Sequence, residues 1–175
     1  MEKNEKSFQE MIKELFENRE LFAKLIIDSS PEKLIIEDVE HIFEIRESTK
    51  LIIMKKQGLG IQEAFGALSK YFIAWSNGWE LEDMRNWKEF TDEERIQIIS
   101  EHWISGFYDR NKLCLEEIRP RVLIKKHDLK GKFRDYRIEI EKLTDAIIID
   151  NDQWDSMYFS MSNDIYLLLS YCFYD

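Results

Sequence analysis

The chain has 175 residues, a hydrophobic content of 44% and a formal net charge of −10 at pH 7. This length suits a single domain, and the hydrophobic content excludes an intrinsically disordered chain. Because the acidic surplus repels phosphate backbones, nucleic acid is not an expected partner, and a basic protein is a better one.

The N-terminal part of the chain carries helix signals. Ser7 and Glu10 form the pattern of a capping box, and apolar residues recur at helical spacing over residues 8–28. The Ser-Pro pair at 30–31 is typical of a second helix start. The apolar face that follows predicts a helix from residue 31. Two alternatives stay open: the helix continues through Ile52 and Ile53 to Gly58, or it breaks near Ser48-Thr49, where β-branched residues cluster.

Two further helices are predicted before residue 110. Apolar residues from Ile61 to Trp75 fall on one helical stripe, and Gly78 supplies the stop signal. Thr91 and Glu94 form a second capping box, which opens a helix with an apolar face. Residues 1–110 are therefore expected to form a helical subregion.

The character of the sequence changes after about residue 111. Short apolar runs with alternation, separated by turn residues, are typical of strands. Strands are predicted over residues 122–124, 133–140, 146–149, 157–162 and 165–174. Residues 133–142 also fit a helix, and the sequence leaves this alternative open. Asn163 and Asp164 tolerate positive φ, so a tight hairpin is expected between the last two strands.

These elements predict an α+β fold. An N-terminal layer of four to five helices is expected to pack on a C-terminal antiparallel β-sheet of about four strands. We expect residues 1–175 to form one domain, with a helical subregion at 1–110 and a β-rich subregion at 111–175. The N-terminus lacks the apolar core of a signal peptide, and two cysteines without metal spacing fit a reducing compartment. The expected localisation is cytoplasmic, without membrane association.

Catalytic signatures are missing from the sequence. It contains no G-x-S-x-G elbow, no P-loop and no C-x-x-C pair. The histidines do not form the two acid-x-x-His pairs that a di-iron bundle needs. We therefore predict that the chain is not an enzyme and uses no cofactor or metal.

The most informative stretch is the acidic turn that follows the apolar run at 147–149. Asp150, Asp152 and Asp155 end a predicted strand, where carboxylates often meet a divalent cation. The spacing fails the EF-hand pattern because Trp154 stands where Asp or Asn is needed and no glycine follows. A solvated turn, a rim of a protein-binding surface and a metal site remain as alternatives.

Alternation in the next strand predicts which side chains are presented there. Met157, Phe159 and Met161 share one face, which we assign to the core, and Tyr158 lies on the opposite face. Tyr158 is then expected on the surface beside the aspartates. The predicted partner-binding residues are Asp150, Asp152, Trp154, Asp155 and Tyr158.

The stretch AIIIDNDQWDSMYFSMSNDIYLLLSY, residues 146–171, resembles the C-terminal strands of small acidic bacterial immunity proteins, which neutralise polymorphic or contact-dependent toxins. This resemblance implies a non-catalytic protein whose partner is a cognate toxin. Two other functions stay open: a phage-encoded inhibitor or nucleic-acid mimic that acts on a defence protein, and a metal-dependent phosphoesterase that uses the aspartates at 150–155. The oligomeric state is not predicted.

Overall fold

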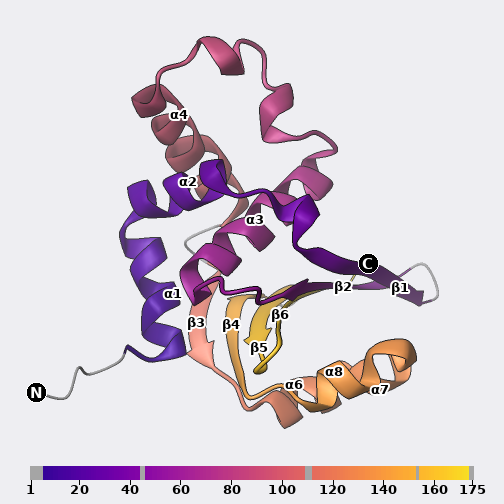
Figure 1. The fold of residues 1–175 in the computed structure, drawn as a ribbon. Coiled ribbons are helices and arrows are strands. Elements are labelled where there is room, and N and C mark those ends of the chain that lie inside the picture. The colour runs from indigo at the N-terminus through magenta and orange to yellow at the C-terminus, as the bar shows by residue number, and fades with distance from the viewer. Residues whose placement is uncertain (1–5, 44–45, 109–111, 153, 174–175) are drawn as a thin grey trace, which may run out of the picture. The chain divides into compact units, whose positions relative to one another are not determined.

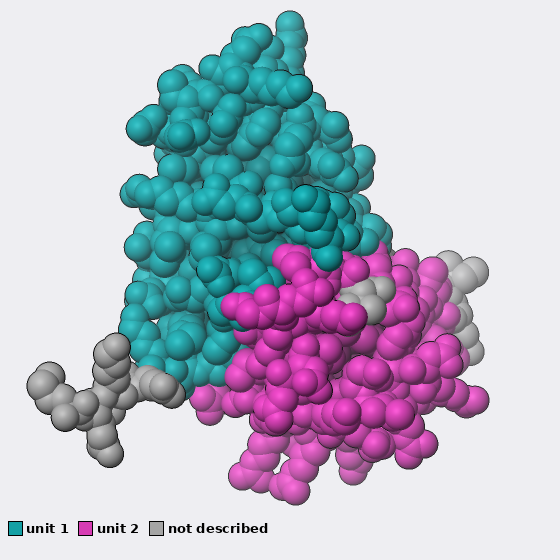
Figure 2. Space-filling model, viewed as in Figure 1, with its two compact units in different colours: residues 1–33, 59–111 teal, residues 34–58, 112–175 magenta. Residues whose placement is uncertain are grey.

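The computed structural model describes residues 6–43, 46–108, 112–152 and 154–173. The chain divides into two compact units (Figure 2). Residues 1–33 and 59–111 form the first, which we call the helical unit, and residues 34–58 and 112–175 form the second, the sheet unit. Each unit is therefore assembled from two separate parts of the sequence.

Helices build the helical unit. Its elements are α1 (Phe8–Glu17), α2 (Arg19–Asp28), η1 (Pro31–Lys33), α3 (Ile61–Asn77), η2 (Leu81–Asp83), η3 (Trp87–Glu89), α4 (Asp92–Ile98), the π-helical turn η4 (Ile99–Ile104) and α5 (Ser105–Phe107). The predicted helix over 8–28 is interrupted at Asn18, whose side chain accepts a hydrogen bond from the amide of Leu21 and starts α2. The helix predicted from Ile61 to the stop at Gly78 is confirmed as α3.

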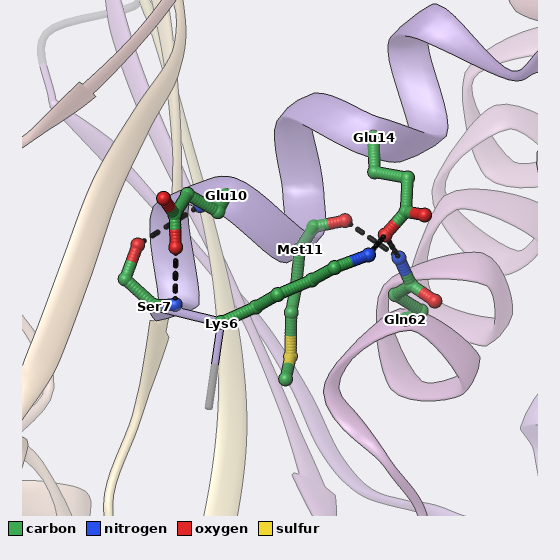
Figure 3. Close-up of polar contacts among 6 residues, drawn as sticks. All are labelled: Lys6, Ser7, Glu10, Met11, Glu14 and Gln62. Carbon is green, nitrogen blue, oxygen red and sulfur yellow. Dashed lines mark hydrogen bonds and ion pairs between the residues drawn. The ribbon is translucent and has the colours of Figure 1, made fainter. Parts of the chain in front are cut away.

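Figure 3 shows how α1 begins and how it is joined to α3. Ser7 Oγ accepts a hydrogen bond from the amide of Glu10 at 3.2 Å, and the Glu10 carboxylate accepts one from the amide of Ser7 at 2.7 Å. This is the predicted capping box. The side-chain amide of Gln62 on α3 donates to the carbonyl of Met11 at 2.8 Å and to the carboxylate of Glu14 at 3.1 Å. The first turn of α3 is therefore held against α1.

Aromatic packing fills the interior of the helical unit. The ring of Phe22 stacks on Phe65 with centroids 5.5 Å apart, and Phe16 meets Tyr108 edge-on at 5.2 Å. Gly66 allows the close approach of α2 and α3, because a Cβ at this position would lie 2.9 Å from the Cβ of Leu25. A larger residue there would push the two helices apart.

The sheet unit contains one six-stranded antiparallel sheet with the order β1-β2-β6-β5-β4-β3 (Figure 1). The strands are β1 (Ile35–Phe43), β2 (Glu47–Lys55), β3 (Leu113–Glu117), β4 (Asp145–Asn151), β5 (Asp155–Met161) and β6 (Ile165–Phe173). The hairpin predicted around Asn163 and Asp164 is confirmed as β5–β6.

One face of this sheet is covered by short helices (Figure 1). These are α6 (Pro120–Lys126), α7 (Leu129–Lys132), η5 (Arg134–Tyr136) and α8 (Arg137–Glu141). Leu123 and Leu129 from the helices share a buried cluster with Leu51, Leu167 and Leu169 from β2 and β6. The helices and the sheet are thus two layers around one core.

The α+β fold is confirmed, but several predicted elements are wrong. Residues 31–53 do not form a helix; they contain η1, β1 and most of β2, so 1–110 is not a purely helical subregion. The isoleucines of this segment favour strands, and β2 is buried from residue 48 to 54 between two neighbours, which hides the alternation of an exposed strand. The sheet accordingly has more strands than predicted.

The opposite error affects the segment after residue 119. The strand predicted at 122–124 lies in α6, which starts with Pro120 at its first position. Of the two alternatives for residues 133–142, the helical one is correct, as η5 and α8. No helix in the described part of the chain is long and apolar enough to cross a membrane.

Candidate functional site

The acidic turn connects β4 and β5 and is held by Asp152. The Oδ1 atom of Asp152 accepts hydrogen bonds from the amides of Trp154 at 2.6 Å and Asp155 at 2.8 Å. Its Oδ2 atom lies 2.9 Å from the ammonium of Lys112. The hydrogen bond from Lys112, followed by those from the two amides, lowers the pKa of Asp152 to about 2. Asp152 therefore stays ionised and fixes the turn.

Asp150 is half-buried at the end of β4. A register shift in the pairing with β5 falls between Ile148 and Asp150. The Oδ1 atom of Asp150 is buried, and no hydrogen-bond partner for it lies among the described residues. Burial raises the pKa of this carboxyl to about 6, although Lys112 acts in the opposite direction. Asp150 is therefore mostly ionised at pH 7 and carries a poorly solvated charge.

Lys112 is the cation that the structure places among these aspartates. Its pKa is raised, first by the hydrogen bond to Asp152 and also by the charges of Asp150 and Asp155. One ammonium thus faces three carboxylates, so the turn keeps a negative charge at neutral pH. Lys112 directly precedes β3. The backbone amide of Asn151 donates to the carbonyl of Lys112 at 3.1 Å, and this hydrogen bond holds Lys112 beside the turn.

Trp154 gives the turn an apolar surface. Its side chain is 39% exposed, and its ring stacks on Phe173 of β6 with centroids 5.9 Å apart and planes inclined by 13°. The amide of Phe173 donates to the carbonyl of Trp154 at 2.8 Å, which holds the two residues together. The exposed stack of Trp154 on Phe173, beside charged aspartates, has the features of an interface anchor with a polar rim.

The predicted exposure of Tyr158 is wrong. Tyr158 is fully buried in the cluster between the sheet and α6–α8. Alternation along β5 places Tyr158 on the face opposite to Met157 and Phe159, and both faces are buried. The face of Tyr158 is covered by the helical layer α6–α8, a segment for which the sequence pattern predicts strands. Tyr158 therefore cannot contact a partner beside the aspartates.

The hydroxyl of Tyr158 belongs to a buried polar cluster that the sequence analysis missed. Lys126 donates to this hydroxyl at 2.9 Å, and the Nε2 atom of His127 lies 3.0 Å from it. Burial, followed by the charges of Lys126 and Lys132, lowers the pKa of His127 to about 4. Since Lys126 can only donate, the hydroxyl proton of Tyr158 is available to the neutral imidazole. The only sequence signal was a histidine after a Pro-initiated apolar run.

Lys132 continues this cluster toward the sheet. Its ammonium contacts the carboxylate of Glu47, donates to Thr49 Oγ1 at 3.1 Å and lies 5.6 Å from the centre of the Tyr171 ring. Each polar group thus meets a complementary group from another element. We interpret this cluster, which includes Lys126, His127, Lys132, Tyr158 and Glu47, as structural.

The aspartates are not arranged as a metal centre. Across the described residues, no group of three or more His, Cys, Asp or Glu side chains could hold a metal ion. The Asp152 carboxylate is engaged by two amides and Lys112 instead. The geometry therefore gives no support to a phosphoesterase that uses Asp150, Asp152 and Asp155.

Comparisons with protein-family models, with curated proteins and with solved structures find no match to this chain. The resemblance of residues 146–171 to bacterial immunity proteins therefore stays a prediction.

Proposed function

We propose that this chain is a non-catalytic binding protein that neutralises a basic protein partner, as an immunity protein does with its toxin. The observation that carries the proposal is the exposed stack of Trp154 on Phe173 beside a turn with more carboxylates than cations. Asp150, Asp152, Asp155 and Trp154 are the proposed contact residues. Tyr158 is no longer included, because it is buried.

The two parts of this surface have different roles. Partly exposed carboxylates attract a basic partner over a distance and raise the association rate, and salt screens this effect. A large aromatic side chain that becomes buried on binding slows dissociation. The net charge of −10 of the whole chain also attracts a basic partner and adds to the effect of the turn on the association rate.

The partner is identified first by affinity capture from the source cells, and it is then purified. Association of the purified proteins is measured by stopped flow at low and high ionic strength. The variant carries Asp152→Asn and Asp155→Asn. Asparagine keeps the oxygen that accepts from the amides of Trp154 and Asp155 but removes the charge.

We expect this variant to associate about three- to tenfold more slowly at low salt, with the difference vanishing at high salt. The matched control carries Asp135→Asn and Asp164→Asn, which remove two exposed charges of the sheet unit elsewhere. Trp154→Ala is expected to raise the dissociation rate. Equal association rates for the turn variant, the control and the parent would remove the turn from the binding site.

The same experiment distinguishes the alternative inhibitor functions. A toxin partner is expected to lose its toxicity when this chain is co-expressed. If the captured partner instead binds DNA or RNA, and nucleic acid competes with this chain for it, the nucleic-acid mimic replaces the immunity function.

A further inference from the structure

Strand β1 (Ile35–Phe43) forms one edge of the sheet (Figure 1). Within the described residues, β1 pairs only with β2, so the other side of its backbone has no strand partner. An edge strand presents a row of peptide groups that a further strand can join.

The two edges of this sheet differ in how they are protected. β3, the opposite edge, is short, its pairing with β4 shifts between Leu113 and Glu116, and Leu115 has a positive φ of 52°. These features are typical of an edge that excludes further strands. β1 has nine residues, contains neither lysine nor proline, and pairs regularly from Glu37 to Phe43 after one shift at its start. β1 is therefore the edge that can accept another strand.

Charge decides which strand β1 accepts. β1 carries Glu37, Asp38 and Glu40 and no lysine or arginine. An antiparallel second copy of β1 would bring these carboxylates close to one another, which is unfavourable. A segment with lysine or arginine would instead place opposite charges across the new pair. Although Lys50 forms an ion pair with Asp38, the acidic surplus of β1 remains.

The end of β1 is continuous with the proposed binding surface. Ile42 and Phe43 are 64% and 53% exposed. Phe43 pairs with Glu47, and Glu47 pairs with Phe173, the residue on which Trp154 stacks. Directly paired residues point to the same face of a sheet. The aromatic side chains of Phe43, Phe173 and Trp154 therefore lie along one end of the sheet.

We infer that β1 binds an extended basic segment of the partner as a seventh strand. This inference rests on the proposed function, because it assumes a basic protein partner. Main-chain hydrogen bonds would supply affinity, Glu37, Asp38 and Glu40 would select a basic sequence, and Ile42 and Phe43 would cover apolar side chains of the segment.

The test uses a synthetic nine-residue peptide of alternating lysine and valine and the isotope-labelled full chain. Binding is followed by NMR shifts and by hydrogen exchange of the β1 amides. We expect the peptide to protect β1 amides and a glutamate–valine peptide of the same length not to do so. A third peptide keeps the lysines but carries N-methyl groups along one edge, which removes its strand-pairing donors. It is expected to bind at least about tenfold more weakly.

Variants locate the effect on the sheet. Glu40→Lys, and the milder Glu40→Gln, are expected to weaken binding of the lysine–valine peptide, whereas Glu116→Lys on the β3 edge leaves it unchanged. Equal binding of the N-methylated peptide, or protection of β3 instead of β1, would overturn the inference. Self-association of the chain that protects β1 amides would assign the edge to a second copy instead. The turn variants test the proposed function with the native partner, whereas the β1 variants are tested with synthetic peptides. Failure of one proposal can therefore be distinguished from failure of the other.

Discussion

The acidic turn and the buried cluster around Tyr158 use the same strand in opposite ways. Asp155 and Tyr158 both belong to β5. At the turn, one lysine faces three aspartates and charge remains near the surface, whereas under α6–α8 the hydroxyl of Tyr158 is shared by Lys126 and His127. Polar residues of one strand therefore stay partly solvated and charged at one end and are buried and paired further along, depending on what covers them.

Both regions contain a desolvated titratable group, but burial acts on the two groups in opposite directions. It raises the pKa of Asp150 to about 6 and lowers the pKa of His127 to about 4. In each case burial favours the neutral form. As the pH rises from about 4 to 6, His127 therefore increases the free energy of unfolding and Asp150 decreases it.

Removing the Tyr158 side chain should have the largest effect on stability. We expect Tyr158→Ala to lower the free energy of unfolding by about 3–5 kcal/mol, because it leaves a cavity under the helices. Tyr158→Phe should cost about 1–2 kcal/mol, because Lys126 and His127 lose a buried partner. Urea denaturation of the full chain measures both. If Tyr158→Ala costs no more than Trp154→Ala at the exposed turn, the contrast between the two regions is false.

Acid should act on the buried cluster through His127. The folded pKa of about 4 lies below the ordinary value of 6.5, so the unfolded chain binds a proton more readily between these values. The contribution of His127 to stability is therefore complete above pH 6.5 and falls by about 3 kcal/mol as the pH decreases to about 4. Urea denaturation across this range should show the loss, and His127→Gln should reduce it.

Neutralising Asp150 should have a smaller effect of opposite sign. Its folded pKa of about 6 lies above the ordinary value of 3.8, so its charge destabilises the folded state fully above pH 6 and not at all below pH 3.8. We expect Asp150→Asn to raise the free energy of unfolding at pH 7 by about 1 kcal/mol, after allowance for partial exposure. The gain should vanish near pH 3.8.

Asp152→Asn is the matched control for this prediction. The pKa of Asp152 is lowered, so its charge stabilises the fold above pH 3.8. Its replacement should decrease stability at pH 7. Loss of stability in both variants would show that Asp150 is better paired than its buried Oδ1 atom indicates.

Local signals in the sequence identified several elements correctly. The capping boxes at Ser7 and Thr91, the stop at Gly78 and the turn at Asn163-Asp164 all lie where they were predicted. Each of these depends on hydrogen bonds or backbone angles within a few residues, so each can be inferred without knowing the rest of the chain.

Long-range pairing explains the errors. β2 lies between β1 and β6, and its pairing joins residues 47–55 to residues 165–173. No local pattern reveals this, so the apolar residues before position 53 also fitted a helix. Residues 120–141 had the same ambiguity between strand and helix. Because strands were predicted there, Tyr158 was expected on the surface, whereas the helices of this segment bury it.

For the acidic turn, the order of residues alone indicates that Asp150, Asp152, Asp155 and Trp154 follow an apolar strand and lie close together. Their charges and exposure depend on contacts with other strands. Lys112, which is distant in sequence, neutralises part of the turn, burial raises the pKa of Asp150, and Phe173 supports the Trp154 ring. These effects depend on distances and solvation between separate strands, which exist only once β3, β4, β5 and β6 have assembled.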